Sequence, residues 1–202
     1  MLEPSIREVR PPPCCPSTTP SLRSVIYLAL LRGINVGGKN KVEMARLRTV
    51  FESLGFTQVR TFINSGNVIF SDDRDPSNLR TLIEKAIAEE FGFPVRVVLR
   101  DLDSVVKVAK SIPAAWKDDA TMRCYVMFLW EEADKPTVLD RLTIKEDIDD
   151  VRYVSGAVIW RVDRDNLTKS GMAKLTSHEL YQAMTIRNCN TVRKLADLMT
   201  AE

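Results

Sequence analysis

The stretch Val25–Lys41, VIYLALLRGINVGGKNK, decides how this chain can fold. Its first residues are almost all apolar and end at Arg32, a pattern that indicates a strand buried on both faces. Glycine, asparagine and lysine residues follow at once, and glycine adopts backbone conformations that other residues avoid. The sequence therefore predicts a buried strand that delivers a polar, glycine-containing loop to one place on the molecule.

Helices and strands alternate downstream of this loop. Apolar residues recur at helical spacing over residues 44–54, and two short strands flank Asn64–Asn67, as in a hairpin. Asp75-Pro76-Ser77 then begins a second helix that Gly92 ends, and residues 95–99 form a fourth strand. The resulting order, β-α-β-β-α-β, is the split βαβ arrangement of a ferredoxin-like domain.

The second half repeats this pattern less clearly. We expect a helix over residues 102–109, an apolar strand at 125–130, a short helix at 138–145, a hairpin turning at Ser155-Gly156, and helices at about 171–183 and 191–199. The Ser-Gly turns at Ser65 and Ser155 are compatible with a degenerate repeat. The predicted fold class is α+β: two ferredoxin-like halves, residues 24–100 and 101–202, related by duplication, with no clear last strand in the second half.

The first 23 residues include PPPCCPSTTP and are predicted to form a disordered tail, because proline blocks both helices and sheet ladders. No run is apolar over the length of a bilayer, and the N-terminus lacks a signal peptide pattern, so we expect a cytoplasmic protein without a membrane partner. The four cysteines, two of them adjacent, do not form a disulfide framework and are expected to be free thiols.

Charge and histidine content restrict the kinds of site. A net charge of +2 is too small for a protein that coats nucleic acid, although residues 24–70 and 151–202 are basic and residues 120–150 acidic. The single histidine, His178, excludes metal sites that need several imidazoles, and we expect it on the surface or in packing. Acidic runs at residues 72–73 and 146–150 are expected to be solvated turns. We therefore predict no metal and no cofactor.

Residues 33–40 nearly match the phosphate-binding loop G-x-x-x-x-G-K-[ST], but Asn40 stands where a hydroxyl must bind magnesium. The next helix also begins too late, so we do not expect a nucleotidase. A turn explains the glycines but not the polar residues around them, whereas backbone N–H groups with two lysines can form an anion-binding nest. The candidate ligand-binding residues of this loop are Arg32, Asn35, Gly37, Gly38, Lys39 and Lys41.

Similar polar segments occur near the other end of the chain. Asn188 and Asn190 are helix-capping residue types at the start of the last helix, and Arg187 precedes them at a terminus that favours anions. The alternative is capping alone, with Arg187 paired to a nearby acid. The candidates from this region, from the 170–174 loop and from the first hairpin turn are Asn64, Ser65, Asn67, Ser170, Lys174, Arg187, Asn188 and Asn190.

The segments LALLRGINVGGKNKV, FINSGNVIF, KSGMAKL and TIRNCNTVRKLADL resemble the signature blocks of a bacterial family called domain of unknown function 1697. The resemblance extends from about Ser24 to Met199 and implies a pair of ferredoxin-like α/β units. Many members carry a bulky residue where this chain has Cys189, so the resemblance implies no aromatic stacking role at that position. It implies no settled activity either.

Our leading hypothesis is that the Arg32–Lys41 loop, the Asn64–Asn67 turn, the Ser170–Lys174 segment and the Arg187–Asn190 helix start converge on one polar cleft between the halves. Such a cleft would bind an anionic small molecule with a phosphate or carboxylate group, or a nucleotide. The lysines and arginines would neutralise the anion, and the asparagines would orient the rest of the molecule.

Three alternatives remain open. A hydrolase or transferase acting on phosphate or acyl esters would use Ser65 or Ser170 as nucleophile, but the sequence shows no paired base. A single-stranded nucleic-acid binder would stack bases on strand aromatics, most of which fit a core pattern instead. A structural or partner-binding protein would leave the cleft empty and carry an exposed apolar patch.

Overall fold

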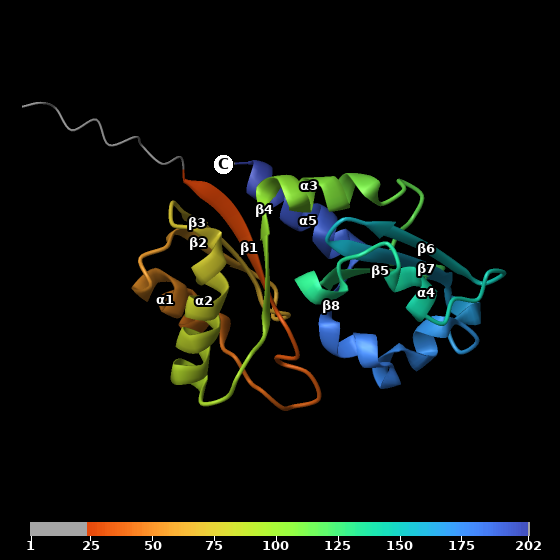
Figure 1. Ribbon diagram of the computed structural model, residues 1–202, viewed down its shortest axis with the longest axis horizontal. Coiled ribbons are helices and arrows are strands. Elements are labelled where there is room, and N and C mark those ends of the chain that lie inside the picture. The colour runs from red at the N-terminus through yellow and green to blue at the C-terminus, as the bar shows by residue number, and fades with distance from the viewer. Residues whose placement is uncertain (1–23, 202) are drawn as a thin grey trace, which may run out of the picture.

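The computed structural model of the protein describes residues 24–201. Two four-stranded antiparallel sheets stand side by side, and two helices lie between them (Figure 1). The first sheet comes from residues 25–101 and the second from residues 122–188. The predicted tail, residues 1–23, lies outside the described residues.

The first half has the predicted order of elements. These are β1 (Val25–Leu31), α1 (Met44–Ser53), β2 (Thr57–Phe62), β3 (Asn67–Asp72), α2 (Pro76–Phe91) and β4 (Val97–Asp101). The strands lie in the order β2-β3-β1-β4, and every neighbouring pair is antiparallel. The strand β4 is therefore one edge of the first sheet.

Local signals place α2 where the sequence predicts it. The Asp75 carboxylate accepts a hydrogen bond of 2.7 Å from the backbone N–H of Ser77, and Pro76 occupies the first turn, where a missing N–H costs nothing. At the other end Gly92 has φ = 78°, a left-handed conformation that glycine adopts without a steric penalty. Capping and turn chemistry thus determine both ends of this helix.

The second half contains shorter elements, among which η denotes a 3₁₀ helix. They are α3 (Leu102–Ser111), β5 (Met122–Leu129), η1 (Glu131–Ala133), α4 (Val138–Arg141), β6 (Asp149–Val154), β7 (Ala157–Asp163), η2 (Arg164–Asn166), η3 (Gly171–Ser177), η4 (Glu179–Ala183), β8 (Met184–Asn188) and α5 (Cys189–Thr200). Its strands lie in the order β6-β7-β5-β8.

The second half has a closing strand, so the prediction that it lacks one is wrong. Strand β8 pairs antiparallel with β5. Met184 and Ile186 pack on the outer core of the second sheet, whereas Thr185 and Arg187 contact the first half. Because these two inward residues are polar, the strand has no apolar run in the sequence. The helix predicted over residues 171–183 is a pair of 3₁₀ helices.

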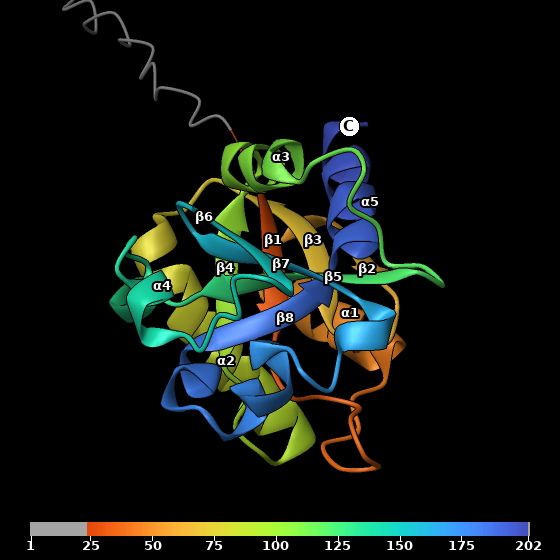
Figure 2. The same cartoon turned by 90° about the vertical axis from the view of Figure 1, so that its right-hand side faces the viewer.

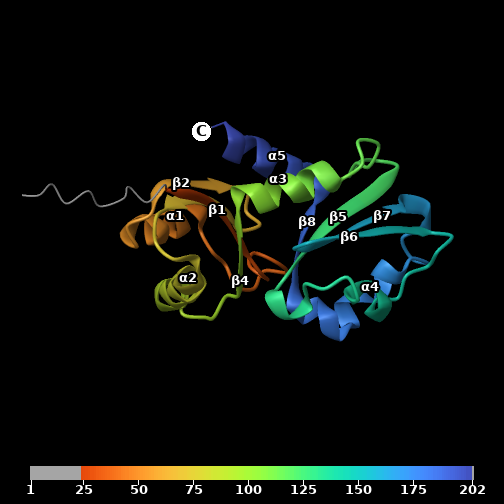
Figure 3. The same cartoon turned by 45° about the horizontal axis from the view of Figure 1, so that its top comes forward.

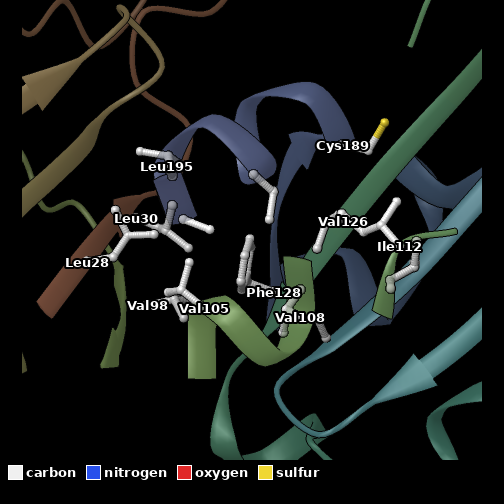
Figure 4. Packing of buried hydrophobic residues seen from close by; sticks show 14 of the residues in the cluster. Leu28, Leu30, Val98, Val105, Val108, Ile112, Val126, Phe128, Cys189 and Leu195 are labelled. Atoms are coloured by element: carbon white, nitrogen blue, oxygen red, sulfur yellow. The ribbon is translucent and has the colours of Figure 1, made fainter. Parts of the chain in front are cut away.

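The helices α3 and α5 form the layer between the sheets (Figures 2 and 3). The helix α3 packs on β1 and β4, α5 packs on β5 and β8, and the two helices pack on each other. Side chains of both sheets and both helices meet in one core, in which Leu28 and Val98 approach Val105 of α3 while Phe128 comes from β5 (Figure 4). The halves are therefore joined by an apolar layer as well as by the polar contacts described below.

Candidate functional site

Arg187 lies at the contact between the two halves and is only 7% exposed. Its Nε donates to Oδ1 of Asn67 (2.6 Å), and its Nη2 donates to the carbonyl oxygens of Leu31 (2.8 Å) and Gly66 (3.1 Å). Nη1 donates to Oγ1 of Thr185 and to a carbonyl of its own strand. All five N–H groups therefore bind protein acceptors, none of which is a carboxylate.

Burial lowers the pKa of Arg187 to about 10, because no counter-charge offsets the loss of water around the guanidinium. The group remains charged at neutral pH, and its neutral acceptors carry the whole stabilisation. The prediction that Arg187 pairs with a nearby acid, which accompanied the capping alternative, is wrong. The guanidinium binds the end of β1 and the first hairpin turn.

Arg32 makes the reverse connection, from the first half to the second. Its Nε donates to the carbonyl of Met184 and its Nη2 to that of Tyr181, both at 3.1 Å, and the guanidinium lies 5.1 Å from the centre of the Tyr181 ring. The contact combines charge-assisted hydrogen bonds with a cation–π interaction. Arg32 and Arg187 thus hold the halves together from opposite sides of the contact.

The glycine loop is anchored to the first hairpin turn by Asn35. Its Nδ2 donates to the carbonyls of Val42 and Asn64, both at 2.9 Å, and its Oδ1 accepts from the N–H of Val42. Lys39 and Lys41 at the tip are exposed, as are Gly37 and Gly38. The structure therefore brings the loop, the hairpin turn and Arg187 together, as the sequence predicts.

The fourth predicted segment lies elsewhere, against the outer face of the second sheet. Ser170 is 3% exposed, and its hydroxyl donates to Oδ1 of Asp149, which also accepts from Nε1 of Trp160 (3.1 Å). The N–H of Gly171 donates to Oδ2 of Asp149 (2.9 Å). Ser170 is thus part of a buried polar anchor, while Lys174 is exposed.

The start of α5 shows the capping that the sequence offered as an alternative to anion binding. Oδ1 of Asn188 accepts a 2.7 Å hydrogen bond from the N–H of Thr191, and Nδ2 of Asn190 donates to the carbonyl of Asp118 (2.9 Å). Both asparagines therefore use side-chain groups to hold the helix start. Whether this end also takes an anion stays a prediction.

Ser65 has no base beside it among the hydrogen bonds recorded for residues 24–201, whereas Ser170 donates to the buried carboxylate of Asp149, which also accepts from Trp160 and Gly171. The hydroxyl of Ser65 accepts from Nδ2 of Asn67 (3.0 Å), and Ser170 is bound to Asp149. The Nδ1 atom of His178 accepts from the N–H of Leu180 (3.2 Å), a local contact at the start of η4. Tyr27, Phe70, Phe128 and Trp160 are buried in the cores, as predicted.

A cleft of about 600 Å³ lies between the halves at the edge of β4. The N-termini of α2 and α3, the segment from Trp130 to Asp134, and the β6–β7 turn at Ser155-Gly156 surround it. Its size falls within the range of small-molecule sites. Sequence reasoning predicted a cleft between the halves but missed the residues that line this one. The signal was Arg100, a charged residue at the end of an apolar strand, as Arg32 is.

Arg100 is half-buried and extends from β4 to the second half. Its Nη2 donates to the carbonyls of Leu129 and Gly156, and its Nη1 donates to the carbonyl of Leu99 (2.9 Å). No recorded hydrogen bond uses Nε, and none of the side-chain nitrogens without a partner in residues 24–201 is fully buried, so Nε keeps some contact with solvent. It lies beside Gly156, 3.1 Å from the position that a Cβ would take there. Burial lowers the pKa of Arg100, and the charges of Asp134 and Glu131 offset part of this.

Most acids around the cleft are already bound to protein donors. Asp75 caps α2, and Asp101 caps α3 by accepting from the N–H of Ser104 (2.8 Å). Asp134 accepts from the hydroxyl of Tyr153 (2.9 Å) and the N–H of Gly156 (2.8 Å). No ion pair with Arg100 is recorded for any of the described acids. Arg100 is therefore a partly buried cation that lacks a carboxylate partner.

Arg80 and Glu131 form the exposed rim of the cleft, with 3.8 Å between Nη1 and Oε1. Such an open pair contributes little to stability. Among residues 24–201, no group of three acids, cysteines or histidines is arranged to hold a metal ion. In that same part of the chain, Cys124 and Cys189 are free thiols, and no helix combines the length and apolar content needed to cross a membrane.

Comparisons with known proteins agree with the family resemblance seen in the sequence. A solved structure of a conserved bacterial protein from Streptococcus pneumoniae matches with a TM-score of 0.75 and 28% identity, over 87% of this chain and 99% of that one. No curated protein matches. The family model described as "Protein of unknown function (DUF1697)" matches residues 25–160. With most of its folded part covered by that model, the chain belongs to the DUF1697 family.

Proposed function

We propose that the protein binds a small carboxylate-bearing molecule in the cleft at the edge of β4, with Arg100 as the group that binds the carboxylate. The observation that carries this proposal is the Arg100 guanidinium, which lines the cleft, is partly buried, has no carboxylate partner and has no recorded hydrogen bond at Nε. Nη2 already binds the carbonyls of Leu129 and Gly156, so the N–H of Nε and the second N–H of Nη1 are the donors left for a carboxylate.

The lining favours a carboxylate over a polyphosphate or nucleotide. Asp75, Asp101, Glu131 and Asp134 outnumber Arg80 and Arg100 at the cleft, so a highly charged anion meets net repulsion. A molecule that carries an ammonium group beside its carboxylate suits both signs of charge. Glu131 is available for the ammonium group, because its side chain is 86% exposed and only loosely paired with Arg80.

Arg32 and Arg187 support this function as positioning residues. Each binds backbone carbonyls of the opposite half, so together they hold the second half against the edge of β4. The cleft is built from both halves and depends on that placement. We also propose a cytoplasmic location, which the free thiols of Cys124 and Cys189 support and cell fractionation tests.

Calorimetric titration with acetate, L-alanine, inorganic phosphate and AMP tests the proposal. We expect the carboxylates to bind more tightly than the phosphates, and Arg100→Met to weaken carboxylate binding about 10-fold or more, since it removes charge-assisted hydrogen bonds. Arg48→Met is the control. Arg48 pairs with Glu52 of its own helix, α1, and does not line the cleft.

Two results would overturn the proposal. One is carboxylate binding that is unchanged in Arg100→Met, and the other is tighter binding of phosphate or AMP than of any carboxylate.

We further infer that each half is a ferredoxin-like unit and that the halves arose by duplication. The strand orders β2-β3-β1-β4 and β6-β7-β5-β8 correspond position by position, and helical segments follow the first and third strands of both. Superposing β1–β4 on β5–β8 in chain order tests this inference. We expect all four strands of one half to superpose on those of the other in a single fit. If only the central hairpins superpose, the duplication is contradicted.

A further inference from the structure

The free edge of β4 presents unpaired backbone groups. The N–H of Arg32 bonds to the carbonyl of Arg96 (3.0 Å), so Arg96, Val98 and Arg100 direct their backbone groups at β1. Because neighbouring residues in an antiparallel ladder point to opposite sides, Val97, Leu99 and Asp101 direct theirs away from the sheet. The 2.7 Å bond from the N–H of Val97 to Glu84 agrees with this assignment.

Leu99 and Asp101 place these outward groups in the cleft. Within residues 24–201, neither of their N–H groups has a recorded acceptor. The carbonyl of Leu99 accepts from Nη1 of Arg100, which locates the guanidinium at the same free edge. The cleft therefore combines two main-chain N–H groups of β4 that have no acceptor among the described residues with the Arg100 guanidinium, which has no carboxylate partner.

The opposite edge of this sheet differs. Strand β2 has a register shift between Thr57 and Arg60, and Gln58 has φ = 53°. Such bulges are a common way to prevent an edge strand from pairing with another chain. Strand β4 pairs with β1 in continuous register from Val97 to Asp101 and has no bulge, although Glu84 holds the outward N–H of Val97. At the cleft, the N–H groups of Leu99 and Asp101 thus remain able to pair with another chain.

We propose that the carboxylate-bearing molecule is a short peptide, which adds its extended main chain to the edge of β4 and places its C-terminal carboxylate on Arg100. This inference rests on the proposed function and names its class of ligand. Strand addition gives affinity through main-chain hydrogen bonds, and a terminal carboxylate is a recognised anchor for peptides. A cleft of about 600 Å³ has room for a peptide of a few residues.

Titration with four probes tests the inference: L-alanine, trialanine, C-terminally amidated trialanine, and a set of trialanines N-methylated at single positions. Trialanine is expected to bind at least 10-fold more tightly than L-alanine, because only the peptide pairs with β4. Amidation and at least one N-methylation should each cost about 10-fold, as each removes a charge or a main-chain donor. In ¹⁵N spectra, hydrogen exchange at the amides of Leu99 and Asp101 should slow when trialanine is bound.

The variant Leu99→Pro removes the outward N–H at a position where an edge strand tolerates proline. It should weaken trialanine binding about 10-fold more than it weakens L-alanine binding, whereas the control Leu99→Val retains both. Thermal unfolding of each variant establishes that it is folded. The N-methylated peptides remove the reciprocal bond of the same ladder, from a peptide N–H to a carbonyl of β4. They do so on the unmodified protein, so the test does not depend on the fold of Leu99→Pro.

The outcomes separate this inference from the proposed function. If L-alanine and trialanine bind with equal affinity and both need Arg100, the peptide inference is wrong and the carboxylate site is retained. If amidation of the peptide and the Arg100→Met substitution both leave peptide affinity unchanged, the proposed carboxylate site is wrong. No binding by any of the probes would overturn both.

Discussion

Arg187 and Asn67 are 120 residues apart in the chain and are joined by a 2.6 Å hydrogen bond from Nε to Oδ1. Asn67 is fully buried and in turn donates from Nδ2 to the carbonyl of Phe62 and to the hydroxyl of Ser65. One side-chain pair therefore connects the closing strand of the second half to the first hairpin of the chain.

Replacing Arg187 by methionine should destabilise the protein by about 3–5 kcal/mol, because it leaves several buried acceptors without a donor. Urea unfolding measures the loss. The control Lys39→Met changes an exposed cation of the glycine loop and should stay within about 0.5 kcal/mol of the unmodified protein. If Arg187→Met lowers the free energy of unfolding by less than about 1 kcal/mol, the hydrogen bonds of Arg187 do not stabilise the contact between the halves.

Gly66→Ala and Gly37→Ala form a matched pair at two left-handed glycines. At Gly66, with φ = 73°, an added Cβ would lie 2.7 Å from Ile34 Cδ1 and from Leu31 Cβ, whereas Gly37, with φ = 59°, has nothing within 4 Å. We expect a cost of roughly 3 kcal/mol at Gly66, from crowding plus conformation, and about 1 kcal/mol at Gly37 from conformation alone. Equal thermal shifts for the two variants would contradict this explanation.

Ser170→Ala should lower stability by about 1–3 kcal/mol, because Asp149 loses one of its buried donors. The same variant should bind carboxylates as the unmodified protein does, since Ser170 lies on the outer side of the second sheet. Ser177→Ala removes an exposed hydroxyl bound only to the carbonyl of Lys174 and serves as the control. If Ser170→Ala loses carboxylate binding but keeps its stability, Ser170 belongs to the ligand-binding site after all.

Asp72 should make stability depend on pH in the acid range. Burial alone would raise the pKa of Asp72, but hydrogen bonds and charge from Arg74, including a 2.7 Å contact from Nη2 to Oδ2, lower it overall. A carboxyl whose folded-state pKa is depressed stabilises the protein above its unfolded-state pKa of about 4 and loses this contribution as pH falls through the folded-state value.

Asp72→Asn should therefore be less stable than the unmodified protein at pH 6, and the difference should shrink as pH falls below about 4. Urea midpoints across that range measure it. Arg74→Met removes the partner and should reproduce the loss at pH 6. A difference that is independent of pH would show that packing, not charge, is responsible.

Much of the first half could be predicted from sequence because its signals are local. Asp75, Pro76 and Gly92 determine the ends of α2 through contacts within a few residues, and the apolar run of β1 requires burial wherever it lies. In the second half, β8 escaped prediction because Thr185 and Arg187 face protein acceptors in the other half. A polar residue satisfied by a distant partner has no signature in its own neighbourhood.

The sequence by itself determined the element order of the first half, the polar glycine loop and the family, since these depend on spacing along the chain. Only the tertiary structure decided that all N–H groups of Arg187 bind protein acceptors, while Arg100 lines the cleft with no recorded partner at Nε. Whether an arginine is satisfied depends on which carbonyls the packed sheets bring within hydrogen-bonding distance, and those carbonyls come from residues far away in the chain.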